Sequence, residues 1–183
     1  MKGFSRGCVI FSLCGLNCGL CAMRVGGYCP GCGGGEGNQS CRFARCAMGR
    51  GAPEFCSDCA EYPCALYEGF DDSDSFVPHS RRAADLKIAQ ELGLEAYLAV
   101  LSEKMEILDE LLGAFNDGRR KTLFCTAAYL LPLPELRCVM SELRAAAQLP
   151  VKERAALASE RLNGAAAQLG LSLKLRKAQR KGR

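Results

Sequence analysis

Residues 14–64 read CGLNCGLCAMRVGGYCPGCGGGEGNQSCRFARCAMGRGAPEFCSDCAEYPC, and ten of these 51 positions are cysteine while eleven are glycine. Only nine are large and apolar, which is too few for a hydrophobic core, because ordering each backbone residue costs about 1–2 kcal/mol. A segment of this kind needs disulfides or metal ions to hold one shape. The sequence therefore predicts that the cysteines staple it.

The redox compartment decides between disulfides and metal. The first residues, MKGFSRGCVIFSLCGL, carry two basic residues and a short apolar patch but no cleavage site of small residues, so they do not predict a secretory signal. The longest apolar run, LFCTAAYLLPLP, is far shorter than the ~20 residues that span a bilayer. We therefore expect a cytoplasmic protein without a membrane segment, in which clustered cysteines indicate metal ligation.

The cysteine spacing supports ligation. A C-x2-C pair places two sulfurs on the same side of a tight turn, where both reach one metal ion, and the segment contains three such pairs. Two four-cysteine sites would use eight ligands and leave two over, and the spacing does not show which two. The predicted metal ligands are Cys14, Cys18, Cys21, Cys29, Cys32, Cys41, Cys46, Cys56, Cys59 and Cys64.

The spacing leaves the identity of the metal open. Residues 29–33, CPGCG, have the form of a zinc knuckle, and Zn²⁺ is the favoured ion. Cys14-x3-Cys18-x2-Cys21 has instead the spacing that ligates a [4Fe–4S] cluster in radical S-adenosylmethionine enzymes, but no alternation of strands and helices follows to build their barrel. An iron–sulfur electron carrier or redox sensor that uses the same cysteines is the alternative.

Composition divides the chain near residues 71–78, DDSDSFVP. The predicted fold is a small metal-stapled, loop-rich cysteine module followed by an all-α helical bundle. The expected domains are a cysteine-rich metal-binding module over 1–75, the bundle over 76–172 and a basic, disordered tail over 173–183. Within the module, residues 8–13 predict a short strand, and residues 14–64 predict loops with at most one or two helical turns.

Hydrophobic periodicity predicts five helices in the second part. Gly93 separates the first two helices, and the turn of residues 116–118, Asn-Asp-Gly, ends the second. Pro132 ends the third helix, because its ring cannot continue one. The expected ranges are 81–92, 94–115, 119–131, from Pro134 onward, and from Pro150 to near Gly170.

The chain resembles a widespread cysteine-rich family known as domain of unknown function 3795. The resembling segments are CGLNCGLCAM (14–23), CPGC (29–32), CRFARCAMGRG (41–51), EFCSDCAEYPC (54–64), PHSRR (78–82) and NDGRRKTLFC (116–125). The resemblance implies a cytosolic metal-binding protein and no established activity. The long glycine run after Cys32 departs from common family members.

Three further features have plain structural interpretations. Residues 31–37, GCGGGEG, lack the ending of a phosphate-binding loop and predict a flexible spacer. His79 is expected on the surface near a helix start. Cys125 and Cys138 are expected to be buried packing residues of the bundle, without a catalytic role.

Positive charge is concentrated at the end of the chain, where the last thirteen residues carry six basic and no acidic side chains. This tail predicts at most non-specific binding of nucleic acid through charge. Arg119, Arg120 and Lys121 lie near a helix start, where the helix dipole disfavours cations, so they are the expected surface for an unidentified protein partner. A metalloenzyme with a site between the two modules is a second alternative, and no catalytic residue is assigned.

Overall fold

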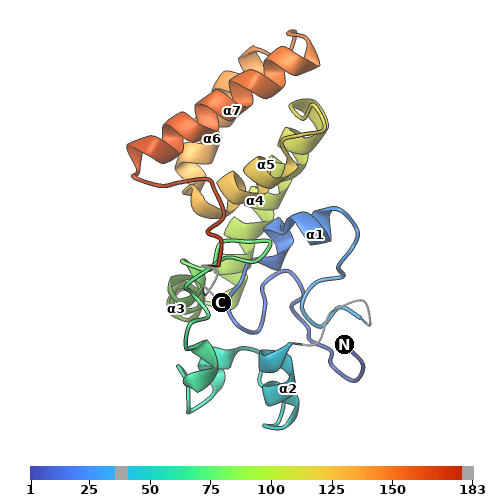
Figure 1. Cartoon of the computed structure of the whole chain (residues 1–183), viewed down its shortest axis with the longest axis vertical. Coiled ribbons are helices and arrows are strands. Elements are labelled where there is room, and N and C mark those ends of the chain that lie inside the picture. Colours follow the sequence, from blue (N-terminus) through green and yellow to red (C-terminus); the bar gives the residue numbers. More distant parts are fainter. Residues whose placement is uncertain (36–40, 179–183) are drawn as a thin grey trace, which may run out of the picture. The chain divides into compact units, whose positions relative to one another are not determined.

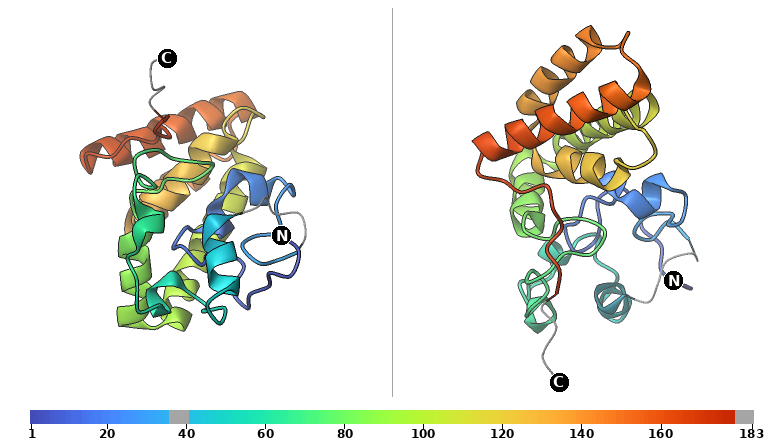
Figure 2. Two further views of the ribbon diagram at one scale, coloured as in Figure 1. Left: turned by 60° about the horizontal axis from the view of Figure 1, so that its bottom comes forward. Right: turned by 45° about the horizontal axis from the view of Figure 1, so that its top comes forward.

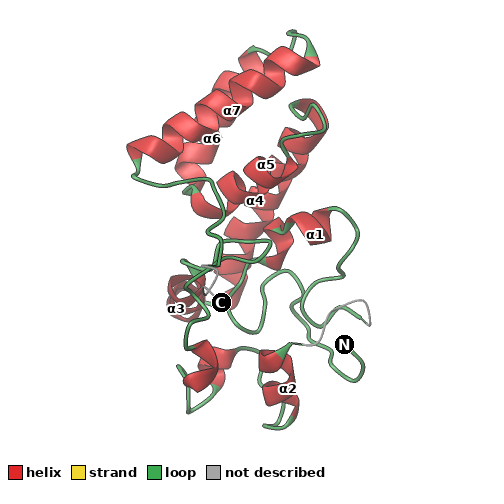
Figure 3. Ribbon diagram, viewed as in Figure 1, coloured by secondary structure: helices red, strands yellow, loops and turns green. Residues whose placement is uncertain are grey.

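The computed structural model describes residues 1–35 and 41–178 and contains helices and loops, with no strand in these ranges (Figure 3). The strand expected over residues 8–13 is therefore wrong. The Arg6 guanidinium accounts for the difference, because it donates to the carbonyl oxygens of Cys8 at 2.9 Å and Phe11 at 3.0 Å. These carbonyls are then not available in the regular alternation that a strand ladder requires.

The described residues divide into two compact units, one of residues 1–35, 41–98 and 175–178 and the other of residues 99–174. The division falls inside α4 (Leu94–Ala114), about one helix later than the boundary that composition indicates. The difference arises at α3 (Arg82–Leu92), which packs with the cysteine-rich unit. Leu86 of α3 is buried and lies against the backbone of Gly15.

The second unit consists of most of α4 together with α5 (Lys121–Leu130), α6 (Leu133–Ala145) and α7 (Val151–Gln168) (Figure 1). The predicted helices are confirmed to within a few residues. Helix α7 lies against both α6 and α5 (Figure 2). Two bidentate ion pairs on the surface, Arg137 with Glu103 and Arg144 with Glu110, join α6 to α4. The fully buried apolar side chains of this unit include Leu108, Leu111, Phe115, Phe124, Leu131, Leu136, Met140, Leu143 and Leu162.

The first unit is loop-rich, as the sequence predicts. Its helical segments other than α3 are short, and α2, at seven residues, is the longest of them. They are η1 (Cys18–Leu20), α1 (Ala22–Val25), α2 (Arg42–Met48), η2 (Cys56–Asp58) and η3 (Ala65–Tyr67).

Contrary to the expectation from composition, the first unit does have an apolar core. The Phe43 ring lies 4.6 Å from the Tyr67 ring and 4.8 Å from the Phe70 ring, measured between centroids. A second aromatic contact joins Phe11 to Tyr97 at 4.7 Å. The sequence argument missed this core because four of these five aromatic residues lie outside residues 14–64. The cysteines therefore add to an aromatic core and do not replace one.

The glycine run after Cys32 is not the flexible spacer that its composition predicts, over the part that the structure describes. Gly31 has a φ of +95°, and a Cβ there would lie 2.4 Å from the carbonyl oxygen of Val9. A Cβ at Gly33 would lie 2.8 Å from the backbone nitrogen of Arg6. Glycine is needed because this loop packs directly on the N-terminal backbone. Residues 36 and 37 of the expected spacer lie outside the described residues.

The expected disordered tail is partly placed. The Arg176 backbone N–H and guanidinium both donate to the Asp74 carboxylate, at 2.7 Å for each of the shortest contacts. The side chain of Asp74 is almost fully buried. Residues 179–183 of the tail lie outside the described residues.

Gly15 offers a test of the packing between the cysteine-rich loop and α3. Its φ is +94°, and an added Cβ would lie 2.5 Å from the carbonyl oxygen of Arg82. Gly27 is a matched control, because its φ is +75° but no atom lies within 4 Å of its added Cβ. Both Gly→Ala changes cost about 1–2 kcal/mol through the left-handed backbone. We expect Gly15→Ala to lower the free energy of unfolding by at least about 1 kcal/mol more than Gly27→Ala, measured by urea unfolding. Equal losses would contradict the packing.

Candidate functional site

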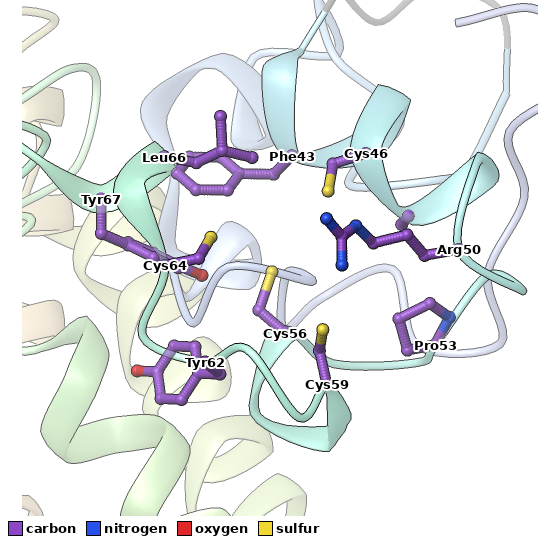
Figure 4. A pocket seen from close by; sticks show the side chains of 11 residues that line it. Phe43, Cys46, Arg50, Pro53, Cys56, Cys59, Tyr62, Cys64, Leu66 and Tyr67 are labelled. Carbon is purple, nitrogen blue, oxygen red and sulfur yellow. The ribbon is translucent and has the colours of Figure 1, made fainter.

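Four of the predicted metal ligands line one small cavity of about 30 Å³ in the first unit. Cys46 lies in α2. Cys56 is the first residue of η2, and Cys59 directly follows that helix. Cys64 directly precedes η3. Figure 4 shows their sulfur atoms turned toward a common space. Three separate segments therefore contribute four thiols to the lining of one cavity, although the sequence spreads them over nineteen positions.

A guanidinium group accompanies these thiols. The Arg50 side chain also lines the cavity and extends between the sulfurs of Cys46 and Cys59 (Figure 4). Arg50 forms an exposed ion pair with Glu61. This pair, and then the nearby Cys46 and Cys59, raise the pKa of Arg50 above its usual value. A fixed positive charge thus stands beside the group of thiols.

The opposite wall of the cavity carries a buried polar stack. Burial raises the pKa of Cys56 to about 11, and the neighbouring Tyr67 hydroxyl opposes this rise. The guanidinium carbon of Arg82 lies 3.9 Å from the centroid of the Tyr67 ring. The same guanidinium donates twice to the Asp71 carboxylate, at 2.7 and 2.6 Å. Sequence reasoning did not find this arrangement, because nothing near Arg82 in the sequence indicates that its guanidinium stacks on Tyr67.

Five other predicted ligands line a second cavity, of about 210 Å³. The rest of its lining is mainly apolar, and the Ser12 hydroxyl lies 3.3 Å from the Cys14 sulfur. The five cysteines are Cys14, Cys18, Cys29, Cys32 and Cys41.

Burial and mutual repulsion disfavour thiolates in this second cavity. Burial is the largest cause and raises the pKa of Cys14 to about 12. The pKa values of Cys18 and Cys32 are also raised, again first by burial, and the charges of neighbouring cysteines add to the rise. These groups stay protonated at neutral pH unless a cation compensates them, and a metal ion that binds them must displace their protons.

Arg6 is a further residue that sequence reasoning missed. Its side chain is only 2% exposed. The guanidinium donates to the carbonyl oxygen of Glu54 at 3.0 and 2.6 Å and also lowers the pKa of Cys32 against the effect of burial. Arg6 therefore joins the N-terminal segment to the loop before Cys56 and places positive charge beside the second cavity.

The loop between Cys14 and Cys18 is held by a buried polar network. The Asn17 amide donates to the Asp85 carboxylate at 3.0 Å and accepts from the Tyr97 hydroxyl at 2.9 Å. Asp85 in turn pairs with Arg81 at 3.6 Å. The first cysteine loop is thus positioned by α3 and by the start of α4.

The structure brings nine of the ten predicted ligands to the two cavities. Cys21 lines neither, although its charge contributes to the raised pKa of Cys18. All the cysteines are free thiols. Within residues 1–35 and 41–178, no three histidine, cysteine, aspartate or glutamate side chains meet in an arrangement that would hold a metal ion. Metal binding therefore requires the thiols to rotate toward the cavity centres.

Two of the expectations outside the cysteine segment need correction. His79 is buried, not on the surface, because its ring stacks on Phe70 and its nitrogens lie 2.9 Å from the Ser75 hydroxyl and 2.8 Å from the Phe70 carbonyl oxygen. Cys138 is exposed on α6, because the buried face of that helix is made by other residues. The expectation for Cys125, buried on α5, is confirmed.

The basic cluster at the start of α5 is less unusual than the sequence indicates. The Arg120 guanidinium pairs with Asp117 at 3.6 Å. The backbone N–H groups of Gly118 and Arg120 both donate to the Asn116 side chain at 3.1 Å. A local carboxylate and a side-chain cap thus compensate the cations at this helix end.

Comparisons with family models, with curated proteins and with solved structures find no match to the chain. The resemblance to the cysteine-rich family stays an expectation. None of the helices in the described part of the chain combines the length and the apolar character needed to cross a bilayer.

The contribution of the Arg82 side chain to stability can be tested by comparing it with that of Arg81, its neighbour in the sequence. Arg82→Lys keeps the charge but loses the two parallel hydrogen bonds to Asp71 and the planar contact with Tyr67. We expect a loss of about 1–3 kcal/mol in the free energy of unfolding, measured by chemical denaturation. Arg81→Lys is the control, because that side chain is 43% exposed and makes one ion pair at 3.6 Å; it should change little. Equal effects would show that the stack contributes nothing specific.

Proposed function

We propose that this chain is a metal-binding protein whose cysteines form two all-cysteine sites, and that the smaller site holds a structural zinc ion. The observation that carries the proposal is the convergence of Cys46, Cys56, Cys59 and Cys64 on one cavity of about 30 Å³. Four thiolates complete the tetrahedral set that zinc adopts in structural sites.

The residues around the smaller cavity fit this ion. Zinc with four thiolates carries a net charge of about −2, and Arg50 places a positive charge beside the sulfurs. No histidine or carboxylate is among the described residues that line the cavity, so the donor set is purely sulfur apart from the two tyrosine hydroxyls.

The chemistry that zinc supplies here is structural. A catalytic zinc keeps one position open for water or substrate, whereas four thiolates close the site. A closed, electron-rich site does not activate water well. Its effect is to join α2 (Arg42–Met48) to the loops on either side of η2 (Cys56–Asp58). We place function in this unit and not in the cluster of Arg119, Arg120 and Lys121, because Arg120 already has a partner in Asp117.

A cysteine that coordinates zinc can be distinguished from one that does not. We expect full-length protein with Cys59→Ser to lose about one zinc per chain relative to the wild type, measured by elemental analysis of the purified protein. Cys138→Ser is the control, because Cys138 is an exposed cysteine of α6 and should not change the metal content. Wild-type protein without zinc, or Cys59→Ser with an unchanged zinc content, would refute the proposal.

A further inference from the structure

The two cysteine cavities differ in size. Both volumes are measured in the same way, about 30 Å³ for the smaller and about 210 Å³ for the larger. A single water needs roughly 10–15 Å³ of such a volume. The smaller cavity therefore accommodates about two atoms of that size, which suits one metal ion once the thiols close on it. The larger cavity accommodates more than about ten atoms of that size. This space is on the scale of a cluster of four irons and four sulfides.

The lining of the larger cavity also suits a cluster. Besides cysteines, its lining includes the apolar residues Phe4, Leu16 and Ala44 and also Ser12, whose hydroxyl lies 3.3 Å from the Cys14 sulfur. Iron–sulfur clusters are held by four thiolates, and their properties are set by burial and by hydrogen bonds to the sulfurs. Cys14 meets both conditions, because it is buried and the Ser12 hydroxyl lies within hydrogen-bond distance of its sulfur.

We infer that the larger cavity binds a [4Fe–4S] cluster through Cys14, Cys18, Cys29 and Cys32, while zinc occupies the smaller cavity, so that one chain holds two different metal centres. This inference rests on the proposed function for the smaller site and extends it to the larger. It also assigns the two surplus cysteines, which are Cys21 and Cys41.

The grouping of the four cluster ligands follows from their mutual proximity. Cys14, Cys18, Cys29 and Cys32 all line the cavity, whereas Cys21 does not. The backbone N–H groups of Gly19 and Cys32 donate to the adjacent carbonyl oxygens of Ile10 and Val9, at 2.7 and 3.2 Å, so the two cysteine loops lie side by side. The fourth ligand therefore comes from the second cysteine pair and not from the consecutive run Cys14, Cys18 and Cys21.

Cys41 has an intermediate position. It lines the larger cavity, but the other four cysteines there already complete a cluster's ligand set. Cys41 immediately precedes α2, which carries Cys46 into the smaller cavity.

The test uses full-length protein purified without oxygen, with zinc, iron and acid-labile sulfide measured for each variant. We expect about one zinc and about four irons per chain in the wild type, with broad absorption near ~400 nm. Cys29→Ser with Cys32→Ser should remove iron, sulfide and this absorption while zinc stays. Cys56→Ser with Cys59→Ser should remove zinc while the cluster stays. Cys21→Ser and Cys41→Ser, each made alone, should retain both centres.

The outcomes separate this inference from the proposed function. Wild-type protein with zinc alone, even at two or more per chain, overturns the cluster and leaves the zinc site standing. A cluster without zinc overturns the proposed zinc site, and protein without metal overturns both. Loss of the cluster in Cys21→Ser or Cys41→Ser overturns the ligand assignment.

A measurement on the wild type keeps the test independent of how the variants fold. X-ray absorption at the zinc edge should show four sulfurs at ~2.3 Å and no neighbouring metal. The iron edge should show sulfur ligands and iron–iron scattering. Zinc with a neighbouring metal at short distance would indicate a shared multinuclear site and contradict two separate centres.

Discussion

The constraint on the first unit is a crowd of thiols that burial keeps from ionising. Burial raises the pKa of Cys14 to about 12 and that of Cys56 to about 11, and neighbouring cysteines raise both further. Such groups gain nothing from one another as neutral thiols, but a bound cation converts their proximity from repulsion into ligation. Arg6 and Arg50 each place positive charge beside one of the two cavities. A guanidinium thus lies near thiols at both sites, and its charge would offset that of the thiolates in the proposed metal sites.

The helical part of the chain was predictable because its signals are local. Gly93, with a φ of +84°, ends α3, and Pro132 precedes α6, as their backbone restrictions require. Leucine periodicity indicated which faces are buried, and Leu111 and Leu136 are fully inaccessible. Cys138 shows the limit of this argument, because residue type alone suggested burial whereas its position on α6 faces solvent.

The cysteine-rich unit was only partly predictable because its geometry depends on distant contacts. Spacing identified the candidate ligands but not their division between sites, since Cys46 joins cysteines ten and more residues later while Cys41 lies with earlier ones. The aromatic core was missed because Phe11 and Phe70 lie outside the cysteine segment. Arg6 was missed because nothing near it in sequence indicates that its guanidinium bonds to the Glu54 carbonyl.

In the proposed function, metal ions hold the cysteine-rich loops in their fold, whereas the leucine-lined helices of residues 99–174 do not need them. Structural zinc contributes roughly 10–16 kcal/mol of apparent binding energy to small cysteine modules. The most direct measurement is an amide nitrogen–proton correlation spectrum recorded before and after removal of metal by a strong chelator under reducing conditions. We expect the signals of residues 14–64 to collapse to the narrow range of an unfolded chain while the signals of residues 99–174 stay dispersed. Unchanged dispersion of residues 14–64 in metal-free protein, or simultaneous loss of both sets, would contradict the account.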